Sequence, residues 1–278
     1  MGLKMNLTKS NYRCHEADME YMSASQVKEF LNCETKALAV LHGNYSEPVT
    51  EAMMVGKYID EALTGDINKF KEDNPSIFSS RGETKGQLKS EFKHADVMID
   101  KLLSSQMVLD ILNRSEKQKI VINEIGGYQF KGMLDLFDPA NVIIDLKKCQ
   151  SIINPVYLDG KWQNFIEAND YVLQLAIYRE LIGNKSKCKI LAVSSEKPYP
   201  DIALINIDSD RMDKAIAGLK PKLDRIYFLK TGKILPIRCE KCNYCRKTKI
   251  LNKEIWLDDL LLPNQSWIND SGIFHGEV

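Results

Sequence analysis

Two short segments hold the residues best suited to chemistry, Gly132-Met133-Leu134-Asp135 and Asp145-Leu146-Lys147. Side chains alternate along a strand, so Asp145 and Lys147 share one face. Turn-forming residues at 138–141 predict an antiparallel hairpin that brings Asp135 near Asp145. Two carboxylates at one place repel each other unless a cation neutralises them, and hard divalent cations prefer such oxygen ligands. These residues therefore predict a site for Mg²⁺ or Mn²⁺, in which Lys147 orients a water or offsets the charge of a phosphate.

A second pair of candidates, Gln174 and Tyr178, lies in a helix predicted from about Trp162 to Ile182. Four residues apart, both project from one helix face. Taken alone, Gln174 would be a surface residue and Tyr178 a core residue, and an Asp-x-Lys triplet also occurs by chance on an exposed strand edge. In chain order, however, Gly-x-x-Asp, a turn, Asp-x-Lys and Gln-x-x-x-Tyr resemble the PD-(D/E)XK nuclease superfamily, and most closely its RecB, lambda-exonuclease and RecE branch.

This resemblance spans roughly residues 124–178 and implies both a fold and an activity. The fold would be α/β, a mixed central sheet flanked by helices, here with a helical N-terminal elaboration. The activity would be that of a metal-dependent DNA exonuclease, resecting double-stranded ends 5′→3′ in phage-type recombination. The single strands left behind would pass to an annealing partner of the RecT kind, and the family's exonucleases are often homo-oligomeric rings. The resemblance assigns catalytic roles to Asp135, Asp145, Lys147, Gln174 and Tyr178.

Two positions depart from the family pattern. Leu134 replaces the proline of the literal Pro-Asp pair, a change common in the superfamily. Upstream, family members often carry Gly-x-x-x-His with the histidine as a metal ligand, whereas the matching run here places Asp60 four residues after Gly56. Asp60 is therefore the expected third metal ligand beside the two aspartates of the hairpin, since a carboxylate also binds Mg²⁺. Glu61, about 100° around the helix from Asp60, and Glu124 are alternatives.

A second group of candidate ligands consists of cysteines. Cys239, Cys242 and Cys245 form a tight C-x2-C-x2-C group, which favours metal or redox chemistry over a disulfide framework in a chain without a secretory signal. The run from Ser23 to Cys33 is similar to the N-terminal element of RecB-type and AddB-type nucleases. In those proteins one N-terminal and three C-terminal cysteines bind a [4Fe–4S] cluster, usually with C-x2-C-x5-C spacing. The resemblance makes Cys33 the fourth ligand, with Zn²⁺ or unliganded thiols as alternatives.

Apolar periodicity predicts the elements that carry these residues. Helices are expected over 23–42, 50–63, 85–113, 162–182 and 209–230, and a loop over 68–83. Strands are expected over 119–125, 128–137, 141–148, 188–195 and 201–207, the first three as an antiparallel meander. We interpret residues 1–278 as one nuclease domain with a mainly helical part (1–115), a nuclease core (116–230) and a cysteine-containing tail (231–278).

The composition excludes several classes of protein. The chain has 278 residues, 44% of them hydrophobic, with 38 basic and 38 acidic side chains, so collagenous and disordered proteins are excluded. Charge is unevenly distributed: residues 211–253 hold 13 Lys and Arg against three acids, which fits either a phosphate-binding surface or a solvated helix face. No P-loop is present for ATP hydrolysis. With no membrane-spanning run and no signal peptide, we expect a cytoplasmic protein, of a bacterial host or phage-encoded.

Two other functions stay open at this point. The first is a nuclease with another task, either an endonuclease or a single-strand repair or Cas-type nuclease with an iron–sulfur cluster. The second is a non-catalytic DNA-binding protein that uses the nuclease fold as a scaffold. Such a protein would retain DNA without Mg²⁺-dependent cleavage.

Overall fold

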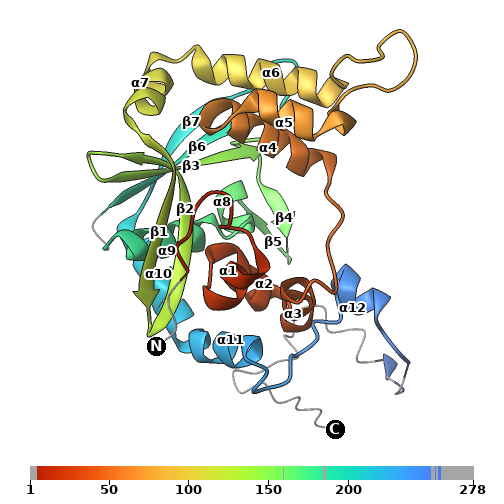
Figure 1. Ribbon diagram of the computed structural model, residues 1–278, viewed down its shortest axis with the longest axis vertical. Helices are drawn as coiled ribbons and strands as arrows, with labels where there is room; N and C mark the ends of the chain where they lie inside the picture. The colour runs from red at the N-terminus through yellow and green to blue at the C-terminus, as the bar shows by residue number, and fades with distance from the viewer. Residues whose placement is uncertain (1–4, 159, 184–185, 252–253, 255, 258–278) are drawn as a thin grey trace.

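The centre of the molecule is a five-stranded mixed sheet in the order β1-β2-β3-β6-β7 (Figure 1). The computed structural model describes residues 5–158, 160–183, 186–251, 254, 256 and 257. The strands are β1 (Glu116–Ile125), β2 (Tyr128–Asp138), β3 (Val142–Cys149), β6 (Lys187–Ser194) and β7 (Ile202–Ile207). The first three form an antiparallel meander, β6 is parallel to β3, and β7 is antiparallel to β6. The expected α/β fold with a mixed sheet is thus confirmed.

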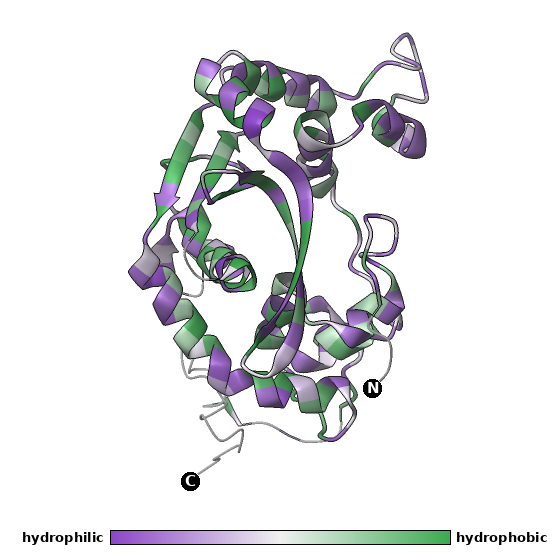
Figure 2. Cartoon of the chain, turned by 60° about the vertical axis from the view of Figure 1, so that its left-hand side comes forward, coloured by the Kyte–Doolittle hydropathy of each residue, from purple (hydrophilic) through white to green (hydrophobic). Residues whose placement is uncertain are grey.

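Helices cover both faces of the sheet and create two hydrophobic cores. One face packs against α4 (Glu51–Thr64), α6 (Ser90–Leu103) and α7 (Gln106–Arg114), at the top of Figure 1. The other face packs against α2 (Ala24–Asn32), α3 (Glu34–Leu41), α9 (Tyr171–Ile182), α10 (Ser209–Leu219) and α11 (Leu223–Lys230). Figure 2 shows hydrophobic stretches in most strands, a hydrophilic stretch in the long strand at the front, and helices that alternate between hydrophilic and hydrophobic residues. A polar side chain on either face of the central strands therefore lies beneath a helix.

Shorter elements complete the described part of the chain. They are α1 (His15–Glu20), α5 (Ile67–Asp73), η1 (Pro75–Ile77), β4 (Val156–Leu158), β5 (Lys161–Gln163), α8 (Phe165–Ala168), η2 (Lys220–Lys222) and α12 (Asn243–Lys247). Among these described residues, no helix is both long enough and apolar enough to cross a bilayer.

Several expected elements have different bounds in the structure. The helix expected over 23–42 is two helices, because Cys33 has extended backbone angles (φ −164°, ψ 107°) and separates α2 from α3. The expected loop over 68–83 contains α5, whose first N–H groups are capped by the Asp66 carboxylate. The helix expected over 85–113 is divided between α6 and α7, which Ser104 and Ser105 separate.

Two C-terminal helices also differ from expectation. The helix expected from Trp162 begins only at Tyr171, since Val156–Leu158 (β4) pairs with Lys161–Gln163 (β5) and α8 follows. The helix expected over 209–230 is interrupted by the short 3-10 turn η2, which contains Pro221. Proline lacks the backbone N–H that a continuous helix needs. These changes leave the sheet and α9 in the places that the candidate site requires.

Candidate functional site

Asp135 and Asp145 meet across the β2–β3 hairpin. The Asp135 Oδ2 atom accepts a hydrogen bond of 2.8 Å from the backbone N–H of Leu146, the residue after Asp145. Asp145 is only 1% exposed, and Asp135 is half-buried. Burial, reinforced by the negative charge of Asp145, raises the pKa of Asp135 well above its usual value. The two carboxylates therefore form the close acidic pair that the sequence predicts.

A local distortion of β2 helps to place Asp135. Leu134 packs in the core beside α9 and Leu136 in the core beside α4, although residues two apart in a regular strand share a face. Between them, at the register position opposite Asp135, β1 carries Gln118 with a left-handed φ of 51°. Non-glycine residues rarely adopt this conformation, so the hairpin is locally twisted where the acidic pair begins.

Lys147 lies on the same face of β3 as Asp145. Its Nζ atom forms a 2.5 Å ion pair with Asp145 Oδ2 and lies 5.0 Å from the centre of the Tyr171 ring. Burial acts to lower the pKa of Lys147, but the charges of Asp145 and Asp135 outweigh it and raise the pKa above its usual value. The ammonium group of Lys147 thus lies in contact with the acidic pair.

Gln174 and Tyr178 reach the acidic pair from α9. Gln174 Nε2 donates to Asp145 Oδ1 at 2.9 Å and lies 3.4 Å from the Tyr178 hydroxyl oxygen. The pKa of Tyr178 is raised by burial and by the charges of Asp145 and Asp135. Close approach of α9 depends on Gly132, because a Cβ there would lie 2.8 Å from Leu181 Cδ1 and 3.2 Å from Tyr178 Cδ1. The structure therefore brings together all five residues to which the sequence assigned catalytic roles.

Asp60 approaches the same group from α4, on the other side of the sheet. The Thr64 hydroxyl lies 2.9 Å from the backbone oxygen of Asp60 and 3.2 Å from its Oδ1 atom, and donates to these acceptors. The same hydroxyl accepts a hydrogen bond of 3.3 Å from Gln118 Nε2. Burial raises the pKa of Asp60, with further contributions from neighbouring acids that include Asp145. A hollow between α4 and β3 is lined by Gly56, Asp60, Leu146 and Lys147.

The two alternative acids are placed differently. The Glu61 carboxylate accepts the backbone N–H of Asp66 at 3.2 Å, near the end of α4. Glu124 pairs in register with Gln129 beside the β1–β2 turn, at the other end of the strand from the position opposite Asp135. That Asp60, Asp135 and Asp145 together bind a hard divalent cation stays a prediction, which agrees with the way burial and mutual repulsion disfavour the charged forms of Asp60 and Asp135.

One cation at the site was missed in the sequence. Lys28 of α2 places its Nζ atom 3.1 Å from Gln174 Oε1, 3.3 Å from the backbone oxygen of Asn169 and 5.3 Å from the Tyr171 ring centre. Burial, with the nearby charge of Lys147, lowers its pKa. Lys28 and Gln174 are 146 residues apart, so no local pattern could connect them.

The basic segment 211–253 offers less free positive charge than its composition suggests. Arg225 forms a two-pronged pair with Glu34, and Arg211 bonds to Glu167. Lys230 is buried, and its Nζ atom donates to the backbone oxygens of Asp18 and Tyr21 at 2.8 Å and to Gln26 Oε1 at 3.0 Å. Residues 252 and 253 lie outside the described residues. These three cations therefore contact other parts of the chain, and a phosphate-binding surface in this segment stays a prediction for the remaining Lys and Arg side chains.

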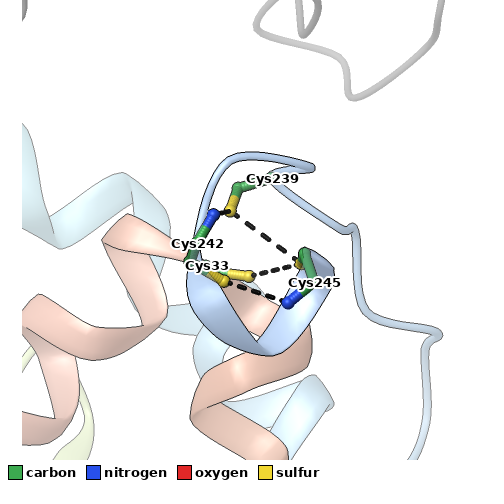
Figure 3. A group of neighbouring side chains, drawn as sticks. All are labelled: Cys33, Cys239, Cys242 and Cys245. Atoms are coloured by element: carbon green, nitrogen blue, oxygen red, sulfur yellow. Dashed lines mark hydrogen bonds between the residues drawn. The ribbon is translucent and has the colours of Figure 1, made fainter. Parts of the chain in front are cut away.

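The four predicted sulfur ligands lie together (Figure 3). Cys33 comes from the α2–α3 junction, and Cys239, Cys242 and Cys245 come from the segment that leads into α12. Their Sγ atoms all lie within 4.8 Å of one another, with Cys33–Cys245 at 3.5 Å and Cys239–Cys245 at 3.9 Å. Such a group of four sulfur donors can hold a metal.

Backbone N–H groups point at two of these sulfur atoms. Those of Cys242 and Cys245 donate to Cys239 Sγ and Cys242 Sγ, both at 3.4 Å. Burial acts to raise the pKa of Cys239, but hydrogen bonds that include the N–H groups of Lys241 and Cys242 outweigh it and lower the pKa to about 7. Hydrogen bonds of this kind stabilise thiolates, the form that binds metals. The other three cysteines, Cys14, Cys149 and Cys188, are free thiols.

Comparisons with known proteins agree with this arrangement. A family model described as a PDDEXK-like domain of unknown function matches residues 23–248. The crystal structure of a protein from Eubacterium rectale that carries the provisional name exonuclease superimposes with a TM-score of 0.85 at 31% identity, covering 92% of this chain and 98% of that one. A structure described as SSO0001 gives a TM-score of only 0.28 at 14% identity, covering 72% of this chain and 85% of that one. No curated protein matches the chain significantly.

Proposed function

This chain belongs to the family of PDDEXK-like domains, and from that premise we propose that it is a metal-dependent DNA exonuclease. The family and the exonuclease-named relative support a nuclease. The observation that carries the finer proposal is that Gln174 and Lys147 both contact the Asp145 carboxylate, while Asp135 accepts the backbone N–H of the next residue, Leu146. By resemblance to the lambda-exonuclease branch, the reaction would be 5′→3′ resection of double-stranded ends.

The chain's own residues divide the work of phosphodiester hydrolysis. Asp60, Asp135 and Asp145 would hold Mg²⁺ or Mn²⁺, which when bound supplies positive charge to the phosphate and lowers the pKa of water. Gln174 fixes one oxygen of Asp145 and so sets the direction of the other. Lys147 brings a hydrogen-bond donor and a positive charge to the place where a phosphate oxygen or an attacking water would lie. Lys28 adds a second cation beside the Tyr171 ring.

Cleavage of end-labelled duplex DNA, with and without Mg²⁺, tests the proposal. We expect Mg²⁺-dependent release of nucleotides from linear duplex, no cutting of closed circular duplex, and earlier loss of a 5′ label than of a 3′ label. Lys147→Ala should abolish the reaction, whereas Lys214→Ala, a change of the same kind on the exposed face of α10, should not. Full activity in Lys147→Ala refutes the assignment. Cutting of circles indicates an endonuclease, and DNA binding without cleavage indicates the scaffold alternative.

We also propose that the sulfur centre holds a single tetrahedral ion, with Zn²⁺ as the best candidate. A tetrahedral ion with Zn–S bonds of about 2.3 Å places its sulfurs roughly 3.8 Å apart. Two of the six separations, 3.5 and 3.9 Å, are close to that spacing, and all six lie within 4.8 Å. An iron–sulfur cubane, which the resemblance implies, binds each thiolate to a different iron and spreads the sulfurs further apart. Metal analysis of the purified protein should find one zinc per chain, and the protein should be colourless. A brown protein with about four irons per chain would contradict the proposal.

The resemblance further suggests a homo-oligomeric ring and a RecT-like annealing partner. Both follow from the proposed exonuclease activity and are tested apart from it. Size-exclusion chromatography with light scattering measures the mass of the assembly, and a mass equal to one chain rules out the ring. Co-purification with a single-strand annealing protein tests the partner.

A further inference from the structure

The β4–β5 hairpin carries an exposed aromatic pair. Tyr157 and Trp162 are cross-strand neighbours with 60% and 69% of their surface exposed, and their ring centres lie 5.3 Å apart at 62°. Ile153, just before the hairpin, is 79% exposed. Large apolar side chains gathered at one exposed place mark an interaction site more often than isolated exposed residues do. The hairpin forms its own two-stranded sheet, separate from the central one.

Chain connections and ring contacts join this hairpin to the candidate active site. The hairpin lies in the sequence between β3, which carries Lys147, and α9, which carries Gln174. Helix α8 touches both of its strands, and Phe165 of α8 lies 6.4 Å, ring centre to ring centre, from Tyr171. The Tyr171 ring in turn contacts the ammonium groups of Lys28 and Lys147. A path therefore runs from exposed aromatic rings to two cations and then to the acidic group.

This order of groups matches the chemistry of a single DNA strand. Phosphates need cations, which Lys28 and Lys147 supply, and unpaired bases offer flat faces that stack on aromatic side chains. Lys161, exposed beside the turn of the hairpin, adds a further positive charge next to the rings. Bases inside a duplex are already stacked and paired, so an exposed Tyr–Trp pair favours unpaired nucleotides at a DNA end.

We propose that Tyr157 and Trp162 stack on unpaired bases at the end of the DNA strand whose phosphate backbone enters the carboxylate site. This inference rests on the proposed nuclease function and adds the form of the substrate: a duplex end with a single-stranded or frayed terminus. It assigns the hairpin to DNA in preference to a second copy of the chain or another protein partner.

Binding of fluorescently labelled DNA tests the inference, with Ca²⁺ in place of Mg²⁺ to suppress cleavage. Each base–aromatic contact contributes about 1–3 kcal/mol, so Tyr157→Ala combined with Trp162→Ala should weaken binding of a DNA with a single-stranded overhang about tenfold or more. Binding of a blunt, covalently closed hairpin duplex should change much less. Met107→Ala, an exposed position on α7, is the control for removal of a large apolar surface residue and should bind both DNAs normally.

Tryptophan fluorescence gives an independent measurement. Stacking of a base on Trp162 should quench emission when the overhang DNA is added, and the quenching should persist in Trp256→Phe but disappear in Trp162→Phe. Loss of quenching only in the Trp162 variant, together with weaker overhang binding, supports the inference.

Three results overturn it: overhang affinity of the double variant within twofold of the wild type, equal weakening for both DNAs, or a change of oligomeric state with unchanged DNA binding. The last would assign the hairpin to a protein contact. Failure here is distinguishable from failure of the nuclease proposal. A wild type that cleaves DNA while the hairpin variants bind normally refutes only the hairpin role, and hairpin-dependent binding without any cleavage refutes only the nuclease.

Discussion

Gln174→Met is the most discriminating test of how the site is assembled. Methionine has nearly the same length as glutamine but cannot donate the 2.9 Å hydrogen bond from Nε2 to Asp145. A hydrogen bond to a charged, buried acceptor contributes about 1.5–3 kcal/mol, which corresponds to roughly 10–150-fold in a binding or rate constant. Because Gln174 acts through Asp145, we expect the loss to fall mainly on the affinity for the divalent cation.

The assay is the rate of duplex degradation measured across a range of Mg²⁺ concentrations. The variant should need more Mg²⁺ for half-maximal rate and should recover much of its activity at high Mg²⁺, whereas Lys147→Ala should not recover. Gln106→Met, an exposed glutamine on α7, is the matched control and should behave as the wild type. Two results contradict the reasoning: an unchanged Mg²⁺ requirement with full activity, or an equal loss of rate at every Mg²⁺ concentration.

Three further predictions concern Lys28, Gly132 and Lys230. Lys28→Met should weaken DNA binding. In a titration with NaCl, the slope of the logarithm of the binding constant against the logarithm of the salt concentration should fall by about one phosphate contact, and an unchanged slope would exclude contact of Lys28 with the DNA backbone. Gly132→Ala should lower the free energy of unfolding in urea by about 1–3 kcal/mol, since its Cβ would lie 2.8 Å from Leu181 Cδ1, whereas Gly218→Ala, with open space around it, should not destabilise. Burial lowers the pKa of Lys230 from 10.5 to about 8, so the unfolded chain binds more protons between these values and stability should rise with pH across the window, by about 3 kcal/mol in all. The rise in the free energy of unfolding, measured from pH 8 to 9.5 by urea denaturation, should be absent from Lys230→Met. The same pH dependence in the wild type and in Lys230→Met would contradict this prediction.

The sheet and its acidic pair could be predicted from the sequence because their signals are local. A turn of a few residues between β2 and β3 is enough to place Asp135 opposite Asp145. The i, i+4 spacing likewise fixes Gln174 and Tyr178 on one face of α9. A mixed sheet and the nuclease resemblance followed from the succession of these elements; the sheet of the structure confirms the first and the family match confirms the second.

Contacts between distant segments were the part that the sequence could not supply. Arg225 is neutralised by Glu34, 191 residues away, so counting charges along 211–253 overstated the positive surface. Lys28 reaches Gln174 from a helix whose apolar pattern says nothing about its polar face. The helix expected from Trp162 starts too early, because Trp162 lies in β5 and Phe165 in the separate short helix α8, and α9 begins only at Tyr171.

The break at Cys33 links the sulfur centre to the candidate active site. A continuous helix over 23–42 would satisfy its backbone hydrogen bonds more simply, yet the chain turns at Cys33 and directs its thiol at Cys245, 212 residues away. The helix that ends there, α2, carries Lys28 on its contact with α9, and the helix that begins there, α3, contacts α12. An ion held by the four thiolates would therefore fix the end of α2 and, through it, the distance between Lys28 and Gln174. An ion at the sulfur centre would in this way help to set the position of Lys28, although the four cysteines are remote from the acidic pair.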